Sequence, residues 1–135
     1  MLILMQGVSG SGKSHIANAI ANAEDLEVVS ADNYMTVFTL GAGWLYQFDP
    51  SRLGVCHKYC REMAEEILMA PQNRGVIVDN TNTTKAEAQP YLDMAKKYGH
   101  KVQVVRVDSH DFDDIHGVPD ETKRRQRRRM QNLLD

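Results

Sequence analysis

Glycine, serine and lysine residues near the amino terminus are spaced for binding phosphate groups. Residues 7–14 read Gly-Val-Ser-Gly-Ser-Gly-Lys-Ser, which fits the P-loop pattern G-x-x-x-x-G-K-[ST]. Glycines let the backbone curl with its N–H groups turned inward, and the helix that follows adds partial positive charge. The stretch therefore predicts a site for the phosphates of ATP, lined by Gly7, Ser9, Gly10, Ser11, Gly12, Lys13 and Ser14.

Three side chains have more specific expected roles in phosphate chemistry. Lys13 can reach the β- and γ-phosphates, and the hydroxyl of Ser14 can ligate Mg²⁺. Asp79 closes the apolar run of residues 76–79, and this pattern is typical of a Walker B strand, whose aspartate holds or orients the metal. We therefore expect ATP and Mg²⁺ to bind, with Ser14 and Asp79 as the metal-binding residues.

Asp32 is the candidate for acid–base chemistry. It follows residues 26–30, a short apolar run that is expected to be a strand. The carboxyl ends of parallel strands are where open α/β sheets place their ligands. Spacing alone leaves two interpretations open, because Asp32 could also cap the next helical turn.

The segments between these residues have the periodicity of alternating strands and helices. Short stretches rich in apolar and β-branched residues, at residues 2–5, 26–30, 76–79 and 101–107, predict strands. Helices are predicted at residues 15–23 and 51–69, and a third begins at a capping box formed by Thr84 and Glu87 and ends at Gly99. Pro90 is expected to kink or restart that third helix.

This order of elements predicts an α/β fold. Successive strand–helix units form a parallel sheet with right-handed crossovers. We expect a three-layer α/β/α sandwich of the P-loop NTPase type, with a mainly parallel four-stranded sheet. The 135 residues suit one domain, residues 1–135, and no internal repeat or linker divides them.

Residues 35–50 are predicted to form an irregular loop rich in aromatic side chains. The aromatic residues are Trp44, Tyr46 and Phe48, and Gly41 and Gly43 lie among them. Aromatic rings on such a loop can stack on a nucleobase. We favour the other interpretation, that they pin the loop to the core.

Composition is that of an ordinary soluble domain. Apolar residues make up 42% and charged residues 25%, and the net charge of −2 creates no overall field favouring nucleic acid or membrane. The chain has no apolar run as long as the roughly 18 residues of a membrane span. Because the sequence opens on a predicted strand and P-loop, we expect no cleavable signal peptide. Cys56 and Cys60 have no zinc-binding spacing, so we expect reduced cysteines and a cytoplasmic protein.

The carboxy-terminal part, about residues 109–135, combines an acidic loop with a basic helix. Residues 123–129 hold six lysines and arginines. The helix could cover the nucleotide as a lid that supplies arginines to the phosphates. It could instead grip a nucleic-acid backbone, or simply be a solvated charged face.

Several separated segments resemble one family of proteins in matching order. Besides the P-loop, the matching segments are residues 30–34, 46–50, 57–60, 78–82, 90–91 and 116–119. The resemblance is to the P-loop kinase family of phage polynucleotide 5′-hydroxyl kinase and the kinase domain of NEDD4-binding protein 2. Asp-Asn-Thr-Asn at residues 79–82 and His-Gly-Val-Pro at residues 116–119 are the most specific of these segments.

This resemblance implies transfer of the ATP γ-phosphate to a hydroxyl group. Asp32 occupies the position of the family's general base, and Asp79 resembles its carboxylate near the metal. Arg129 matches an arginine of the family's final helix. Because Arg124, Arg125 and Arg128 are near Arg129 in the sequence, we expect the lid contacts to phosphate to come from these four arginines.

Two positions differ from the family pattern. The polynucleotide kinase has an arginine three residues after its base, where it contacts a phosphate of the acceptor, and here Met35 stands there. Relatives have an arginine shortly before His-Gly-Val, where this chain has Asp113 and Asp114.

We thus expect an ATP-dependent phosphotransferase whose acceptor is the 5′-hydroxyl of a polynucleotide. One alternative is a kinase of a nucleoside or nucleotide. Another is a nucleotide-binding module or weak NTPase that acts through a nucleic-acid or protein partner.

Overall fold

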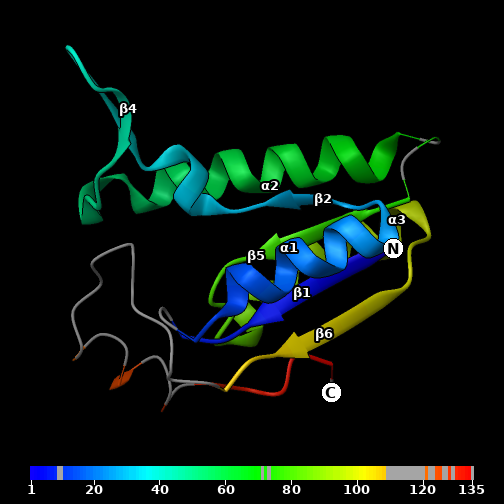
Figure 1. The fold of residues 1–135 in the computed structure, drawn as a ribbon. Helices are drawn as coiled ribbons and strands as arrows, with labels where there is room; N and C mark the ends of the chain where they lie inside the picture. Colours follow the sequence, from blue (N-terminus) through cyan, green and yellow to red (C-terminus); the bar gives the residue numbers. More distant parts are fainter. Residues whose placement is uncertain are drawn as a thin grey trace.

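A four-stranded parallel sheet forms the centre of the computed structural model (Figure 1). The strand order is β2-β5-β1-β6, and every neighbouring pair is parallel. The structure describes residues 1–8, 11–70, 72, 74–108, 121, 124, 125, 128 and 130–134, without the side chains of residues 37–39. The strands are β1 (Leu2–Gln6), β2 (Glu27–Val29), β5 (Val76–Asp79) and β6 (Val102–Arg106).

Helices cover both faces of this sheet. Helix α1 (Lys13–Glu24) lies on one face, and α2 (Leu53–Met69) and α3 (Lys85–Tyr98) lie on the other (Figure 1). Alternate residues of the central strands therefore face different helices. Ile3 and Met5 belong to the cluster with α1, whereas Leu2 and Leu4 belong to the cluster with α2 and α3.

The predicted three-layer α/β/α fold is confirmed, and its strands and helices lie where periodicity placed them. Strands β1 and β5 are buried along their whole length. Burial on both faces explains why they are continuous apolar runs without the alternation of a half-exposed strand.

The ends of α3 show how local chemistry fixes an element. The Thr84 hydroxyl accepts a hydrogen bond from the Glu87 amide at 3.3 Å, as expected for a helix cap. The Glu87 carboxylate turns to Thr83, whose amide donates to it at 3.0 Å. The helix continues through Pro90 without a break and ends at Gly99, which has a left-handed φ of 74°.

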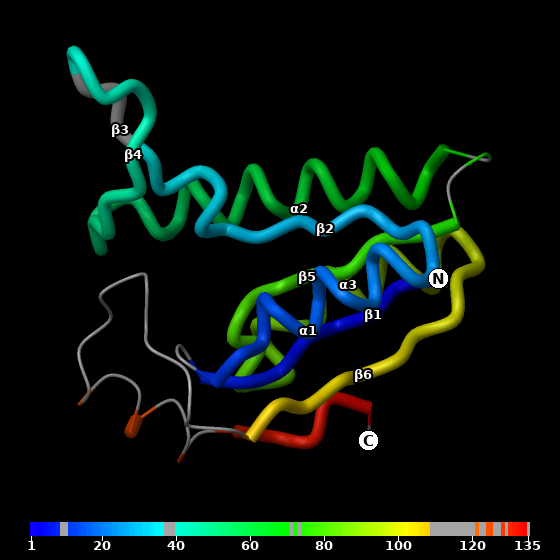
Figure 2. Tube along the Cα trace, in the orientation of Figure 1, coloured from blue at the N-terminus to red at the C-terminus, as the bar shows by residue number. Residues whose placement is uncertain are grey.

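Residues 35–50 differ from the prediction, because they contain a β-hairpin. Strands β3 (Thr36–Thr39) and β4 (Gly43–Tyr46) pair antiparallel, separately from the main sheet. Figure 2 shows this hairpin projecting from the body near the start of α2. Gly41 lies in its turn and Gly43 begins β4; their φ values of 85° and 75° belong to a conformation that glycine adopts readily.

The aromatic residues of the hairpin region divide into two groups. Tyr46 and Phe48 pack against the main core, so the interpretation that they pin the segment is correct. Trp44 is 70% exposed, so for this residue the interpretation was wrong.

The end of the chain returns to the sheet. Leu133 is buried in the core cluster of α2 and α3. Gln131 accepts a hydrogen bond from the Gln6 side chain at 2.6 Å and donates its amide to Thr83. Most of the predicted lid, including residues 109–120, lies outside the described residues. No helix in the described part of the chain is long and apolar enough to cross a membrane.

Candidate active site

Three neighbouring strands deliver the predicted site residues to one edge of the sheet. The P-loop follows β1, Asp79 ends β5, and Asp32 comes three residues after β2. These strands are adjacent in the order β2-β5-β1 and run parallel, so their carboxyl ends meet. In Figure 1 the arrowheads point toward the side where the hairpin projects.

The P-loop has the backbone features that its glycines were expected to provide. Gly12 has φ 89°, a left-handed conformation, immediately before α1. At Gly7 a Cβ atom would lie 2.8 Å from the Val107 carbonyl oxygen, so a side chain does not fit. Because Gly12 has no side chain to cap α1, amides at this helix start remain suited to an anion. Ser9 and Gly10 lie outside the described residues.

Ser14, Lys13 and Asp79 form one cluster. The Ser14 hydroxyl donates a hydrogen bond to Asp79 Oδ2 at 2.6 Å, and Lys13 Nζ lies 3.8 Å from Asp79 Oδ1. Lys13 and Asp79 are both buried. The structure thus brings together the predicted phosphate-binding lysine and both predicted metal-binding residues.

Two buried oxygen atoms, one on the P-loop and one on Asp79, fit a bound metal and phosphate. Asp79 Oδ1 and Ser11 Oγ have no hydrogen-bond partner among the described residues. A buried polar group without a partner is costly, and a ligand can supply the missing interaction. One carboxylate and one hydroxyl suit Mg²⁺, which takes few protein ligands and completes its shell with phosphates and water. The described part of the chain contains no cluster of three or more His, Cys, Asp or Glu residues arranged for a metal.

Asp32 does not cap the turn that contains it. Ser30 takes that role, since its hydroxyl accepts a hydrogen bond from the Asp32 amide at 3.2 Å at the start of a short 3₁₀ helix (Ala31–Tyr34). The half-buried Asp32 carboxylate accepts a hydrogen bond from the Tyr46 hydroxyl at 3.4 Å. Of the two interpretations of Asp32, capping is therefore wrong.

Asn80 was missed as a site residue, although it follows Asp79 directly. Its side-chain oxygen accepts a hydrogen bond from the buried Ala31 amide at 2.8 Å. This bond ties the end of β5 to the residue before Asp32. The sequence signal that could have identified Asn80 is its position as a polar residue directly after a buried strand.

Asn82 and Gln6 support the P-loop in a similar way. The Asn82 side-chain amide donates to the Met5 carbonyl at 2.8 Å, and Gln6 donates to the Asn82 carbonyl at 3.1 Å. The Gly7 amide donates to the Thr81 carbonyl at 3.1 Å. The segment after β5 therefore holds the end of β1, and this explains why residues 79–82 are so polar and yet mostly buried.

Met35 explains one difference from the family pattern. It is fully buried in the core, so this position offers nothing to a bound acceptor. Arg52 holds the backbone on either side of it, because its guanidinium donates to the Tyr34 carbonyl at 2.8 Å and to the Thr36 carbonyl at 3.2 Å.

Burial shifts the titration of three side chains near this edge. Desolvation lowers the pKa of His57, an effect that Glu87 opposes and Arg61 strengthens, so the imidazole tends to be neutral. Burial raises the pKa of the Cys60 thiol and of the Tyr91 hydroxyl. Cys56 and Cys60 are free and buried, as expected for reduced cysteines.

The predicted lid arginines are only partly described. Arg124, Arg125 and Arg128 have helical backbone and are exposed. Arg129, Asp113 and Asp114 lie outside the described residues. The role of these arginines stays a prediction.

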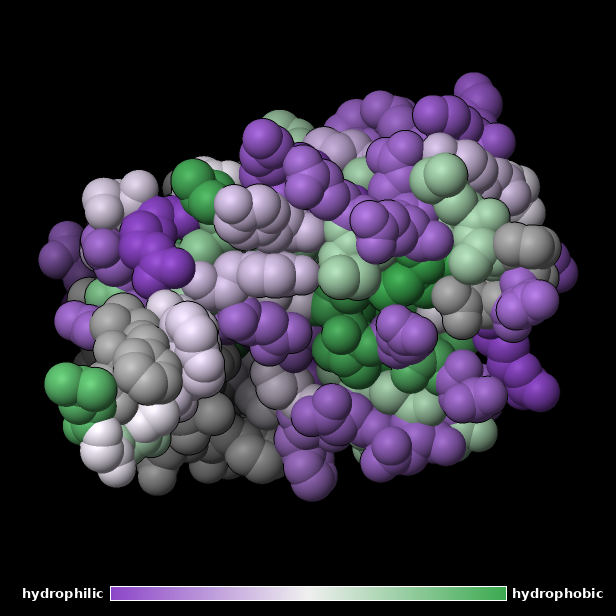
Figure 3. All heavy atoms as spheres, turned by 90° about the horizontal axis from the view of Figure 1, so that it is seen from above, coloured by the Kyte–Doolittle hydropathy of each residue, from purple (hydrophilic) through white to green (hydrophobic). Residues whose placement is uncertain are grey.

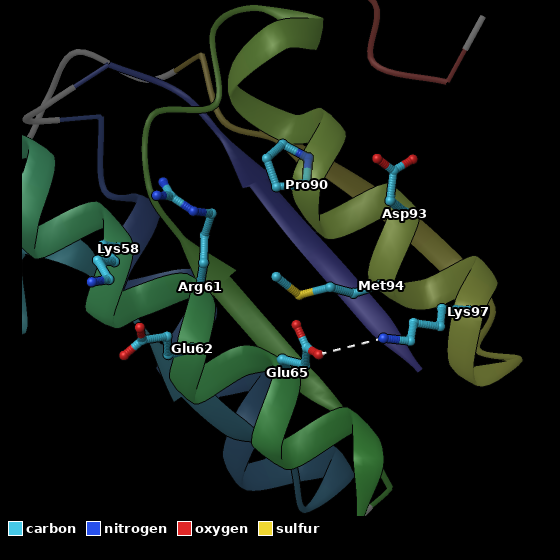
Figure 4. A pocket seen from close by; sticks show the side chains of 8 residues that line it. All are labelled: Lys58, Arg61, Glu62, Glu65, Pro90, Asp93, Met94 and Lys97. Carbon is cyan, nitrogen blue, oxygen red and sulfur yellow. Dashed lines mark ion pairs between the residues drawn. The ribbon is translucent and has the colours of Figure 1, made fainter.

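A separate groove of about 440 Å³ lies between α2 and α3 (Figure 4). An ion pair between Glu65 and Lys97, 3.8 Å apart, spans it. Its lining balances three cationic and three anionic side chains, from Lys58, Arg61, Lys97, Glu62, Glu65 and Asp93. None of the predicted site residues lines it, so the groove is distinct from the phosphate site.

Fold and site together define a P-loop kinase-like domain. The chain matches the AAA domain family over residues 2–132 and belongs to that family. It is 32% identical to human NEDD4-binding protein 2 over 103 residues, which are 76% of this chain. The chain spans only 6% of the length of that relative.

Solved kinase structures share the fold at low sequence identity. A gluconokinase from Sinorhizobium meliloti 1021 is 16% identical with a TM-score of 0.62, covering 98% of this chain and 75% of its own. The APS kinase CysC of Mycobacterium tuberculosis is also 16% identical, with a TM-score of 0.55, covering 95% of this chain and 94% of its own. These similarities confirm the α/β P-loop kinase fold.

Proposed function

We propose that residues 1–135 form one kinase domain that transfers the γ-phosphate of ATP to a hydroxyl group, the 5′-hydroxyl of a polynucleotide. The observation that carries this proposal is the meeting of Asp32, Asp79 and the P-loop at the carboxyl ends of three adjacent parallel strands. A carboxylate beside a phosphate-binding loop is what an unactivated hydroxyl needs in order to react.

In the proposed reaction Asp32 takes the proton of the acceptor hydroxyl while the acceptor oxygen bonds to the γ-phosphorus. The bond from that phosphorus to the bridging oxygen of ADP breaks, and ADP leaves. Lys13 balances the charge of the β- and γ-phosphates. Ser14 and Asp79 would hold Mg²⁺, which neutralises phosphate charge when it is bound. Arg124, Arg125, Arg128 and Arg129 would close over the phosphates from the carboxy-terminal side.

The acceptor has a second candidate, a small molecule such as a nucleoside or nucleotide. Burial of Met35 favours it, because the position that contacts an acceptor phosphate in the polynucleotide kinase is sealed in the core here. The gluconokinase and APS kinase with similar folds give further support.

Asp32→Asn tests the proposed reaction. We expect it to abolish phosphoryl transfer and to leave ATP affinity within about twofold, because Asp32 follows β2 and the phosphates bind after β1. General-base removal costs roughly 100- to 10,000-fold in rate. The measurement is transfer from γ-labelled ATP to a 5′-hydroxyl oligonucleotide and, separately, to free nucleosides.

Asp25→Asn is the matched control, since Asp25 is an exposed aspartate at the far end of α1. It should transfer phosphate at the normal rate. A normal rate in Asp32→Asn as well would show that Asp32 is not the base. Preference for the oligonucleotide or for the nucleoside decides between the two acceptors.

A further inference from the structure

The β3–β4 hairpin exposes hydrophobic side chains next to the candidate base. Leu40 is 90% exposed, Trp44 70% and Leu45 47%. In Figure 3 the left-hand end, where the hairpin projects in Figure 1, shows near-neutral and a few hydrophobic residues beside hydrophilic ones. The whole stretch of residues 35–48 contains no charged side chain. An uncharged surface of this kind is unsuited to gripping phosphate and suited to a flat apolar ring.

Hydrogen bonds fix the base of the hairpin to the segment that carries Asp32. The Tyr46 hydroxyl donates to Asp32 Oδ1 at 3.4 Å, and the Gln47 amide donates to the Met35 carbonyl at 2.9 Å. Arg52 holds the carbonyls of Tyr34 and Thr36 from the start of α2. The hairpin therefore has a defined position relative to Asp32.

Strand geometry places Trp44 and Tyr46 on the same face of β4. Side chains alternate along a strand, so Leu45 lies on the opposite face. Tyr46 contacts Asp32, and Trp44 is two residues farther out, about 7 Å along the strand. Tyr46 and Trp44 thus form a row on one face of β4, and the end of this row at Tyr46 contacts Asp32.

We propose that this face of β4 is a stacking platform, on which Trp44 binds the nucleobase of the phosphate acceptor. The inference rests on the proposed kinase function and adds the residue that binds the base of the acceptor. Indole is a favourable stacking partner because every base presents a flat π-face. Continuity with Asp32 through Tyr46 is what assigns the platform to the acceptor.

Trp44 is the one tryptophan of the chain, so selectively excited tryptophan fluorescence reports on this platform alone. The experiment titrates the protein without ATP against thymidine, a 5′-hydroxyl oligothymidylate and gluconate. We expect saturable quenching by thymidine and the oligothymidylate and none by gluconate, which has no aromatic ring. Stronger quenching by the oligothymidylate than by thymidine would identify a polynucleotide acceptor.

Kinetics test the same platform independently. Trp44→Ala should raise the KM for the base-containing acceptor roughly 5- to 150-fold, the effect of removing one stacking aromatic, with the KM for ATP unchanged. Trp44→Phe, which keeps an aromatic ring, should avoid most of this increase in KM. Leu45→Ala is the matched control on the opposite face and should leave both constants unchanged.

Several outcomes would overturn the inference while leaving the kinase function intact. One is transfer to an oligonucleotide that Trp44→Ala does not alter, without quenching. A second is quenching by ATP and not by thymidine, which would assign the platform to the phosphate donor. A third is tryptophan emission that varies only with protein concentration, which would assign the platform to contact with a second copy of the chain. Saturable quenching without transfer to any hydroxyl would instead overturn the kinase function and the acceptor role with it.

Discussion

Asn80 links the two carboxylates of the site through its position and one hydrogen bond. It follows Asp79 in the chain and holds the amide of Ala31, the residue before Asp32. Its side-chain amide lies 3.5 Å from both Cys60 Sγ and the Tyr91 hydroxyl. Asn80 touches neither phosphate-binding nor proton-transfer atoms, so it acts by positioning.

Asn80→Ala is predicted to reduce both stability and transfer. The buried Ala31 amide would lose its partner, which costs about 1–3 kcal/mol in free energy of unfolding. Phosphoryl transfer should fall while ATP affinity changes little. Urea unfolding and transfer kinetics measure the two effects. The exposed neighbour of Asp32 provides the control, Asn33→Ala, which should behave as wild type. Equal stability of Asn80→Ala and Asn33→Ala would contradict the prediction.

Two glycines at helix ends show how an element depends on backbone conformation. Gly99 ends α3 with φ 74°, where its amide bonds to the carbonyls of Ala95 and Lys96. Gly54 lies in the first turn of α2 at helical φ. A Cβ atom would meet no neighbour within 4 Å at either position. Their difference is therefore conformational and not steric.

The same substitution should have opposite effects at these two glycines. Gly99→Ala should lower the free energy of unfolding by about 1–2 kcal/mol, because alanine is strained in the left-handed conformation. Gly54→Ala should raise it by up to about 1 kcal/mol, because the unfolded chain loses freedom. Thermal and urea unfolding of both variants provide the measurement. A stabilising Gly99→Ala would refute the helix-end role.

The carboxy-terminal tail connects distant parts of the whole molecule. The Gln131 carbonyl accepts a hydrogen bond from Gln6, which precedes the P-loop. The Gln131 side chain accepts a hydrogen bond from the Lys85 amide at 2.9 Å. Leu133 is only 3% exposed and belongs to the core between the sheet and α3. The tail thus fastens the first strand and the third helix together after the chain has passed through the basic segment.

Leu133→Ala should destabilise the whole domain by about 2–5 kcal/mol, because truncating a buried leucine side chain leaves a cavity. Its neighbour Leu134 is 55% exposed, so Leu134→Ala should change the free energy of unfolding by less than about 0.5 kcal/mol. Equilibrium unfolding in urea compares the two. The Leu133→Ala variant should lose ATP affinity only at urea concentrations that unfold the variant. Equal effects of the two substitutions would show that the tail does not complete the core.

Much of the fold followed from the sequence because its signals are local. The buried strands, the cap at Thr84 and the P-loop glycines each depend on neighbouring residues. Asp32 and Asp79 each follow or end a strand, as expected, and these strands are neighbours because strand–helix units leave few topologies. The hairpin was missed because its pairing depends on partners across a glycine turn, and its apolar residues do not alternate against a core.

By itself, the sequence determined the phosphate-binding loop and the alternating elements, because short-range spacing sets both. Only the tertiary structure decided the environment of each side chain, because burial depends on what packs there from distant segments. It buried Met35, exposed Trp44 and paired Asp79 with Ser14, which lies 65 positions away in the chain. It also gave Asn80 and Gln131 their positioning contacts, whose partners lie 49 and 46 positions away in the chain.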